Sequence, residues 1–517
     1  MTFEIVFVLL SLLGMMAALI ADKMRPGMVL FSVVVLFLCV GILTPKEMLE
    51  GFSNKGMITV ALLFLVSEGI RQSGTLGQVI KKLLPQGKTT VFKAQLRILP
   101  SVAFISAFLN NTPVVVIFAP IIKHWAKSVK LPATKFLIPL SYVTILGGIC
   151  TLIGTSTNLV VHGMILEAGY EGFTMFELGK VGIFIAIAGI IYLFIFSKRL
   201  LPDARPDTAV PDEEVEEGEK LHRVEAVLGA RFPGINKKLS DFNFQRHYGA
   251  EVKEIKTRNG QRYVDHLEDV VLREGDTLVV MADDTFIPTW GESSVFVLLT
   301  NGNDPDTSGK KKRWLALILL VLMIVGATVG ELPATKAMLP DIKLDMFFFV
   351  CITTIIMAWT NIFPARKYTK YISWDILITI ACAFAISKAM VNSGVADCVA
   401  GFIIGLSDDY GPHVLLAILF VITNLFTELI TNNAAAALAF PLALSISAQL
   451  GVSPTPFFVV ICMAASASFS TPIGYQTNLI VQGIGNYKFT DFVRIGLPLN
   501  IITFLISVIL IPLIWNF

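Results

Sequence analysis

Charged residues are scarce in this sequence. Of its 517 residues only 15% are Asp, Glu, Lys or Arg, whereas 54% are hydrophobic, and the mean hydropathy is +0.71. A soluble protein of this length has about a quarter of its residues charged, so we expect lipid to cover much of the apolar surface. The net charge is only +2, and the aromatic residues lie in apolar runs instead of basic clusters. Both features argue against a nucleic-acid partner.

The sequence also lacks the motifs of enzymes and of ATP-driven pumps. It has no CxxC pair, no HExxH, no Ser/His/Asp set and no carboxylate pair at membrane depth. Between residues 200 and 310 there is no GxGxxG or Walker motif and no cysteine, and the lack of cysteine fits a reducing cytoplasm. Five of the six cysteines lie inside apolar stretches, where we interpret them as small buried hydrophobic residues. We therefore expect neither catalysis nor ATP-driven transport.

Long apolar runs are abundant. A helix of about 20 mostly apolar residues crosses a bilayer. The first run, Phe3–Ile20, has no basic residue before it, so we expect a transmembrane helix there instead of a removed signal peptide. Two longer runs, Ile98–Ile122 and Val414–Ala448, each contain an Asn-rich polar patch, which indicates a re-entrant hairpin. The other candidate crossings are Met28–Leu43, Met57–Ile70, Phe136–Val161, Val181–Phe196, Trp314–Val329, Phe347–Ile362, Trp374–Met390, Phe457–Val481 and Ile495–Trp515.

The positions of Lys and Arg predict the orientation of these spans. The segments Arg71–Arg97 and Lys123–Lys135 contain basic residues and no acidic ones, so the first hairpin between them is expected to enter from the cytoplasm. We expect a multi-pass protein of the bacterial inner (plasma) membrane. The orientation then puts the hydrophilic middle of the chain in the cytoplasm. Asp397, Asp408 and Asp409 precede the second hairpin, which is therefore expected to enter from outside.

The two halves of the chain match at an offset of about 320 residues. Thr151–Val161 reads TLIGTSTNLVV and Thr471–Val481 reads TPIGYQTNLIV, so eight of eleven positions are identical or pair Val with Ile. The charge pattern orients the two copies oppositely. Matching sequence with opposed topology is typical of secondary transporters built from inverted repeats.

The predicted fold is an all-α polytopic membrane protein of two inverted-topology repeats, with re-entrant hairpins and broken helices, plus a small α+β cytoplasmic insert. The expected boundaries are residues 1–199 for the first membrane repeat, 200–219 for an acidic linker, 220–300 for the insert, 301–313 for a basic linker and 314–517 for the second membrane repeat. Alternating and turn-forming residues in the insert predict strands at His222–Leu228, Ala250–Lys256 and Thr277–Ala282, a short helix at Leu239–Tyr248 and a turn at Asn259–Gly260. The acidic stretch Asp212–Glu219 is expected to be solvated.

Each repeat carries two polar motifs at membrane depth. Glycine lets a helix unwind, freed carbonyl groups and Asn or Thr oxygens can hold a hard cation such as Na⁺, and half-helix N-termini favour an anion. Two such sites facing each other suit an oxyanion or carboxylate that moves with cations, although small polar residues also pack helices together. The hairpin motifs are Asn110-Asn111-Thr112 and Thr431-Asn432-Asn433, preceded by Ser106 and Thr427; the broken-helix motifs are Gly154–Asn158 and Gly474–Asn478.

Several ionisable residues also fall at membrane depth, where such groups are commonly functional. Glu428, beside the second hairpin tip, is a candidate for coupling or gating. Glu68 and Lys388 occupy equivalent repeat positions near span ends, where they either function or reach the interface. Arg71 is interpreted as an interfacial anchor, and His162 as a polar lining residue.

These motifs resemble those of the divalent anion:sodium symporter family, within the ion transporter superfamily, over nearly all of the chain outside the insert. That family has paired Ser-Asn-Thr motifs at its hairpin tips and a Thr-Pro-Pro-Asn-like motif on each broken helix. The resemblance implies a homodimer with an elevator-like transport domain. It implies Na⁺ binding by Ser106, Asn110, Asn111, Gly154, Asn158, Thr427, Thr431, Asn432, Gly474 and Asn478. It implies substrate binding by Asn110, Asn111, Thr112, Thr155, Ser156, Thr157, Asn158, Thr431, Asn432, Asn433, Gln476, Thr477 and Asn478.

The departures from that pattern bear on the substrate. Neither hairpin reads Ser-Asn-Thr, both Pro-Pro pairs are missing, and Thr471–Asn478 resembles a branch with cytoplasmic regulator domains that is often linked to sulfate. No arginine is available to hold two carboxylates bidentately, so a compact tetrahedral anion fits better. We therefore expect Na⁺-coupled symport of sulfate. A di- or tricarboxylate symporter of the same fold is the first alternative, and an ion channel or Na⁺/H⁺ antiporter gated by the insert is the second.

The insert resembles the C-terminal domain of regulators of potassium conductance (RCK C), as in Trk potassium uptake. The matching strings are Tyr248–Val252 and Leu272–Val280. The resemblance implies a regulatory domain that pairs across a dimer and binds a small ligand of unknown identity. A purely structural spacer is the alternative.

Overall fold

The structure of the protein is a computed structural model. It describes residues 3–21, 24–85, 87–203, 222–229, 232–257, 261–283, 286, 290, 295–300, 310–338, 343–405 and 411–517. Four features expected from the sequence lie outside the described residues: the acidic stretch Asp212–Glu219, the Asn259–Gly260 turn, and Asp408 and Asp409.

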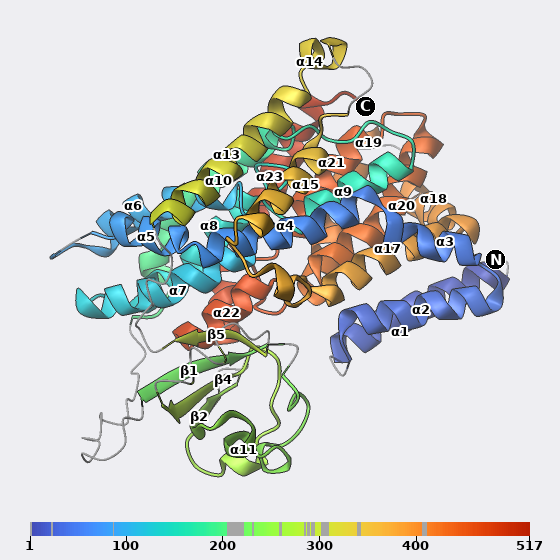
Figure 1. Ribbon diagram of the computed structural model, residues 1–517. Helices are drawn as coiled ribbons and strands as arrows, with labels where there is room; N and C mark the ends of the chain where they lie inside the picture. Colours follow the sequence, from blue (N-terminus) through green and yellow to red (C-terminus); the bar gives the residue numbers. More distant parts are fainter. Residues whose placement is uncertain are drawn as a thin grey trace, which may run out of the picture.

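Helices form the chain on both sides of the insert (Figure 1). Before the insert they are α1 (Phe3–Ala21), α2 (Pro26–Val40), α3 (Pro45–Glu50), α4 (Lys55–Gln72), α5 (Thr75–Leu83), α6 (Val91–Ser106), α7 (Asn111–Ser128), α8 (Leu137–Gly148), α9 (Ser156–Glu167) and α10 (Gly179–Leu200). After it they are α13 (Lys310–Gly330), α14 (Pro333–Met338), α15 (Met346–Trp359), α16 (Tyr368–Tyr371), α17 (Trp374–Asn392), α18 (Val395–Gly405), α19 (Gly411–Leu429), α20 (Asn432–Leu450), α21 (Thr455–Ser466), α22 (Gln476–Gly485) and α23 (Phe489–Ile514).

The helix breaks fall at the polar motifs found in the sequence. The two interrupted runs divide into α6 and α7 and into α19 and α20, and the two broken helices divide into α8 and α9 and into α21 and α22. Helices of the two halves pack against each other: α2 on α17, α10 on α23, α9 on α20 and α7 on α22. One hydrophobic core joins both halves, so the four breaks are held inside a single helical body.

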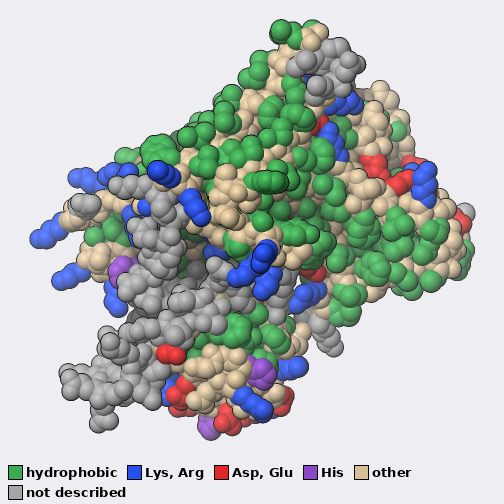
Figure 2. Space-filling view, in the orientation of Figure 1, with side chains coloured by type: hydrophobic (Ala, Val, Ile, Leu, Met, Phe, Trp, Pro, Cys, Tyr) green, Lys and Arg blue, Asp and Glu red, His purple; other side chains and the backbone are tan. Residues whose placement is uncertain are grey.

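The surface of this body fits a lipid environment. Eight helices among the described residues are long and apolar enough to cross a membrane. On α23, Leu497, Ile501, Leu505, Ile509 and Leu513 recur every four residues and are each at least 50% exposed, which makes a continuous apolar stripe. A stripe of this size on a soluble monomer would be unusual, whereas lipid accommodates it. Hydrophobic side chains cover much of the visible helical face, and Lys and Arg gather over the ends of α5, α6 and α7 (Figure 2).

The insert contains an antiparallel five-stranded sheet in the order β3-β2-β4-β1-β5. Aromatic side chains, among them Phe232, Phe244, Tyr248 and Phe296, pack with Leu278 in a separate core on this sheet. The strands are β1 (His222–Leu228), β2 (Glu251–Lys256), β3 (Arg262–Tyr263), β4 (Thr277–Ala282) and β5 (Phe296–Thr300).

The predicted helix at Leu239–Tyr248 is wrong as a single element. The structure has a 3₁₀ turn at Leu239–Asp241 and a separate short helix, α11 (Phe244–Tyr248). The Asn243 side chain accepts a hydrogen bond from the backbone N–H of Arg246 and so starts the second helix anew. The three predicted strands correspond to β1, β2 and β4, whereas β3 and β5 were not predicted.

The sheet lies against the helical body beside α7 and α22 (Figure 1). β5 packs near α7, and Lys123 of α7 forms an ion pair with Glu225 of β1 at 3.0 Å. On α22, a Cβ atom placed on Gly483 would lie 2.5 Å from Oγ1 of Thr277 in β4. The insert therefore touches two helices that each begin at one of the polar motifs.

Candidate functional site

Four helices begin at the polar motifs: α7, α9, α20 and α22. Their N-cap residues are Asn110, Thr155, Thr431 and Tyr475, and none of these side chains caps the helix that follows it. The first N–H groups of a helix have no partner within the helix, and the helix dipole makes this end positive. Each of the four motifs therefore presents donors suited to an anion.

The two hairpin tips have the same hydrogen-bond pattern. Ser106 lies 2.8 Å from the side-chain amide of Asn111, and Thr427 donates to Oδ1 of Asn432 at 2.7 Å. All four side chains are buried. In the orientation that satisfies both ends of the Asn111 amide, Nδ2 donates to the carbonyl of Thr144 at 3.0 Å. The correspondence extends the sequence match between the halves to side-chain contacts, while the opposed orientation of the repeats stays a prediction.

The two broken helices match in the same way. Nδ2 of Asn158 donates to the carbonyl of Thr151 at 2.9 Å, and Nδ2 of Asn478 donates to the carbonyl of Thr471 at 3.1 Å. Three residues after each threonine, a glycine donates its N–H to the threonine hydroxyl. The distance is 3.2 Å from Gly154 to Thr151 and 3.3 Å from Gly474 to Thr471.

Both positions require glycine, because a carbonyl oxygen lies where a Cβ atom would be placed. A Cβ atom on Gly154 would lie 2.5 Å from the carbonyl oxygen of Gly148, and one on Gly474 would lie 2.5 Å from that of Thr427. Real Cβ atoms do not approach carbonyl oxygens this closely. Each helix break is thus pressed against a backbone carbonyl from a neighbouring segment.

One buried oxygen in the first repeat lacks a hydrogen-bond partner. Oδ1 of Asn158 is fully buried and unpaired within the described part of the chain, whereas Oδ1 of Asn478 accepts from Ser141 at 2.7 Å. An unpaired buried acceptor costs about 1–3 kcal/mol. A cation bound by oxygen atoms would satisfy it, so the residues present fit a Na⁺ site at this break.

Each hairpin tip meets the broken helix of the other repeat. Asn433 accepts from the hydroxyl groups of Ser156 and Thr157 at 3.2 and 3.3 Å, and Thr112 lies 3.3 Å from Oε1 of Gln476. The predicted substrate residues of the two halves are therefore brought together, and uncharged hydroxyl and amide groups form the contacts between them.

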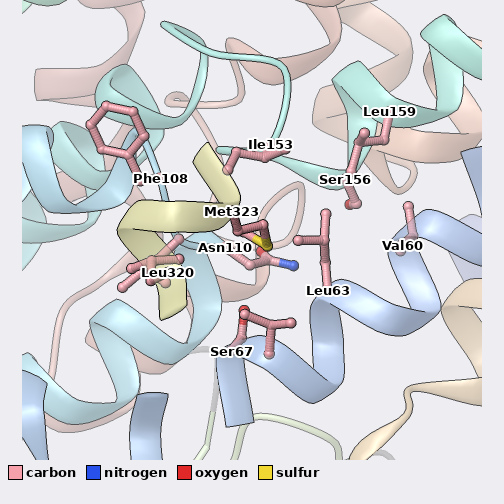
Figure 3. A pocket seen from close by; sticks show the side chains of 12 residues that line it. Val60, Leu63, Ser67, Phe108, Asn110, Ile153, Ser156, Leu159, Leu320 and Met323 are labelled. Atoms are coloured by element: carbon pink, nitrogen blue, oxygen red, sulfur yellow. The ribbon is translucent and has the colours of Figure 1, made fainter. Parts of the chain in front are cut away.

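Other predicted site residues make different contacts. The Thr477 hydroxyl lies 2.9 Å from Oγ of Ser141 in α8, and Thr431 is exposed. Asn110 lines a narrow pocket with Ser67 of α4 and Met323 of α13, where helices outside the motifs approach the first hairpin tip (Figure 3). Ser156 also borders this pocket.

Glu428 is held by neutral donors. The backbone N–H of Ser470 and the Asn500 amide donate to its Oε1 at 2.9 and 2.7 Å, and Ser468 lies 3.5 Å from Oε2. No Lys or Arg forms an ion pair with this half-buried carboxyl group in the part of the chain that the structure describes. Glu68, in contrast, pairs with Arg71 at 2.6 Å, so Arg71 has a carboxylate partner within the protein.

Two residues of the site were not assigned from the sequence. Ser141 donates to Oδ1 of Asn478 and lies 2.9 Å from the Thr477 hydroxyl. Ile461 stands at the matching position of the second half, so no repeat signal marks Ser141. Tyr475 did carry a signal, because it replaces the Thr155 of the first motif by a much larger residue.

The family assignment follows from a match over most of the chain. The pattern of the family described as citrate transporter matches residues 16–448 and 341–517. The chain belongs to the citrate transporter family. It is thus a multi-pass membrane transporter and not an enzyme.

The relatives of this citrate transporter family member are named for sulfate, for dicarboxylate or for no substrate. An uncharacterized transporter of Synechocystis sp. is 29% identical over 569 residues, covering 94% of this chain and 93% of the relative. Sodium/sulfate cotransporter 2 of Chlamydomonas reinhardtii is 30% identical over 281 residues, 54% of this chain and 31% of the relative. A sodium-dependent dicarboxylate transporter of Staphylococcus saprophyticus is 25% identical over 145 residues, 28% of each chain. The resemblance drawn from the motifs is confirmed at the level of this group of transporters, while the RCK C resemblance of the insert stays a prediction.

Proposed function

We propose that the protein is a Na⁺-coupled symporter of a divalent anion, with sulfate as the leading substrate. The observation that carries this proposal is the meeting of each hairpin tip with the broken helix of the other repeat, beside helix N-termini that lack side-chain caps. Hydroxyl groups, amide groups and free N–H groups bind a compact oxyanion from several directions.

Coupling follows from charge balance. A divalent anion among neutral groups in a buried site is costly unless opposite charge lies nearby. Na⁺ ions held by the Asn111 and Asn158 oxygens on one side, and by the Asn432 and Asn478 region on the other, would supply that charge. Binding of the cations then raises the affinity for the anion, and the reciprocal effect holds for the anion on the cations.

A dicarboxylate or tricarboxylate substrate is the second candidate. The family description names citrate, and one relative is named for dicarboxylate transport. The absence of Lys and Arg from the contacts of the described site residues favours sulfate over an elongated dianion, because carboxylate pairs are commonly held by bidentate arginine.

Uptake into proteoliposomes tests the proposal. Saturable uptake of labelled sulfate that depends on an inward Na⁺ gradient, and that excess succinate does not inhibit, is the expected result. Strong inhibition by succinate would support the second candidate instead. A sulfate flux that does not saturate as the sulfate concentration rises would favour a channel.

The insert is proposed to be a cytoplasmic regulatory domain, and the protein to act as a homodimer with an elevator-like mechanism in a bacterial inner membrane. The contacts of the insert support the regulatory role, because β1 reaches α7 through Glu225 and Lys123, and β4 adjoins α22. A ligand that moves the sheet would pull on two helices that start at the substrate motifs. Cross-linking of the membrane-embedded protein tests the dimer, and uptake with the Lys123–Glu225 pair removed tests the regulatory role.

A further inference from the structure

The Tyr475 side chain joins the two halves of the site. Its hydroxyl group bonds to Oδ1 of Asn111 at 2.5 Å and lies 3.0 Å from Oγ1 of Thr155. Asn111 of the first hairpin tip and Thr155 of the first broken helix therefore both contact the hydroxyl group of a residue from the second half. Tyr475 as a whole is only 9% exposed.

The two repeats are unequal at this position. Thr155 precedes α9 and Tyr475 precedes α22 at the matching place in each motif, and neither side chain caps its helix. Since the hydroxyl lies at the far end of the ring, the ring spans the distance from the start of α22 to the first hairpin tip. It therefore occupies space beside an uncapped helix N-terminus, where the matching residue of the other repeat is the smaller Thr155.

We propose that Tyr475 determines which anions the site accepts: its ring limits the length of the bound anion, and its hydroxyl holds the first hairpin tip and the first broken helix at a fixed distance from the start of α22. This inference rests on the proposed function, because it concerns the substrate of the same site. A transporter discriminates against an unwanted ligand by a steric clash as well as by contacts with the wanted one. A close-packed ring that is hydrogen-bonded at its tip resists displacement, so a second carboxylate finds no room beside it.

The test compares Tyr475→Thr, which reproduces the first repeat, with Tyr475→Phe, which keeps the ring and removes the hydroxyl. Tyr192→Phe is the matched control, because this variant loses a buried tyrosine hydroxyl that bonds to the Ile495 carbonyl in another part of the helical body. Thermal stabilisation of the detergent-solubilised protein by sulfate or succinate in Na⁺ buffer reports binding without requiring transport.

We expect sulfate, and not succinate, to stabilise the wild type and Tyr192→Phe. In Tyr475→Thr, succinate should stabilise the protein and sulfate should require a concentration about tenfold higher. Tyr475→Phe should still exclude succinate while binding sulfate more weakly, since the ring is kept and the hydrogen bond to Asn111 is lost.

Two outcomes would overturn the inference. The first is a Tyr475→Thr variant that binds sulfate and still rejects succinate, which would leave the proposed function intact. The second is wild-type protein that binds succinate well, which would contradict the sulfate assignment too.

Discussion

Asn111 and Asn432 are the side chains on which the two proposed cation sites converge. Each is buried and pairs with a hydroxyl group five residues earlier, on Ser106 or Thr427. Loss of a buried amide that hydrogen-bonds or ligates costs about 1–3 kcal/mol. We expect Asn111→Ala and Asn432→Ala each to raise the Na⁺ concentration for half-maximal uptake by about tenfold or more.

Asn392→Ala is the control for these variants. The Asn392 amide donates to the Ile42 carbonyl and to Glu47, so its loss removes comparable hydrogen bonds outside the motifs. If both hairpin variants take up substrate with the Na⁺ dependence of the wild type, the assignment of the site is wrong.

Glu428 is predicted to tune the second cation site. Its carboxyl group accepts hydrogen bonds from Ser468 and Ser470. Glu428→Gln keeps the shape and removes the ionisable group, so we expect apparent Na⁺ affinity to fall by about tenfold, a change of about 1.4 kcal/mol, while the protein stays folded. Na⁺ titration of uptake measures this. Unchanged Na⁺ dependence would show that the carboxyl group acts only as a structural acceptor.

At the scale of elements, the helix breaks depend on glycine. A methyl group on Gly154 or Gly474 would meet a carbonyl oxygen at 2.5 Å, so either the break or the neighbouring segment must shift. Overpacking of this kind costs about 1–3 kcal/mol. We expect Gly154→Ala and Gly474→Ala to lower both Tm and uptake. Gly14→Ala on α1, where no heavy atom lies within 4 Å of the new Cβ, should change neither.

The attachment of the insert is an electrostatic contact with a defined pH window. Burial alone would raise the pKa of Glu225, but Lys123 and Lys256 outweigh burial and lower it from 4.5 to about 2. A carboxyl group with a lowered pKa stabilises the folded state above its unfolded pKa and loses this contribution as the pH falls through the folded value. The contact should therefore persist from neutral pH down to about 4.5 and weaken between there and about 2.

Glu225→Gln tests this contact at neutral pH. Removing one partner of a buried ion pair costs about 3–5 kcal/mol, and the partial exposure of Lys123 and Glu225 puts the cost below that range. We expect faster hydrogen exchange in β1 and in the middle of α7. Glu251→Gln, which removes an exposed pair with Lys253, is the control and should leave exchange in α7 unchanged. Equal exchange in both variants would contradict the predicted attachment.

The elements were predictable wherever residue type alone determines them. Polar patches in apolar runs marked the breaks before α7 and α20, because unpaired backbone groups at membrane depth need polar partners. β5 was missed because Phe296–Thr300 is a short apolar run without alternation, and its pairing with β1 depends on residues far away in sequence. The helix expected at Leu239–Tyr248 failed because an Asn243 cap competes with a continuous helix.

The site itself was only partly predictable. The repeat match located the motifs, and hydrogen bonds between Asn433 and Thr157 bring predicted residues together. The match could not show that Ser141 would hold Thr477 and Asn478, because that contact exists in one repeat only. Nor does a one-dimensional match show that Tyr475 reaches across to the other half.

At the scale of the whole molecule, two matching halves share one core, and a small sheet contacts a helix from each half, α7 and α22. A transporter needs at least two conformations that place the substrate site differently relative to the membrane. Coupling requires that the cation and the anion both stabilise the same conformation. The pairing of hairpin tips with opposite broken helices provides such a shared unit, because neither half forms the contacts alone.

The most direct test of this account is sulfate uptake into proteoliposomes with and without an inward Na⁺ gradient. The account predicts saturable uptake that requires the gradient and that Asn111→Ala and Asn432→Ala each impair. Equal uptake with and without the gradient, or no sulfate uptake from protein shown to be folded, would contradict Na⁺-coupled sulfate symport.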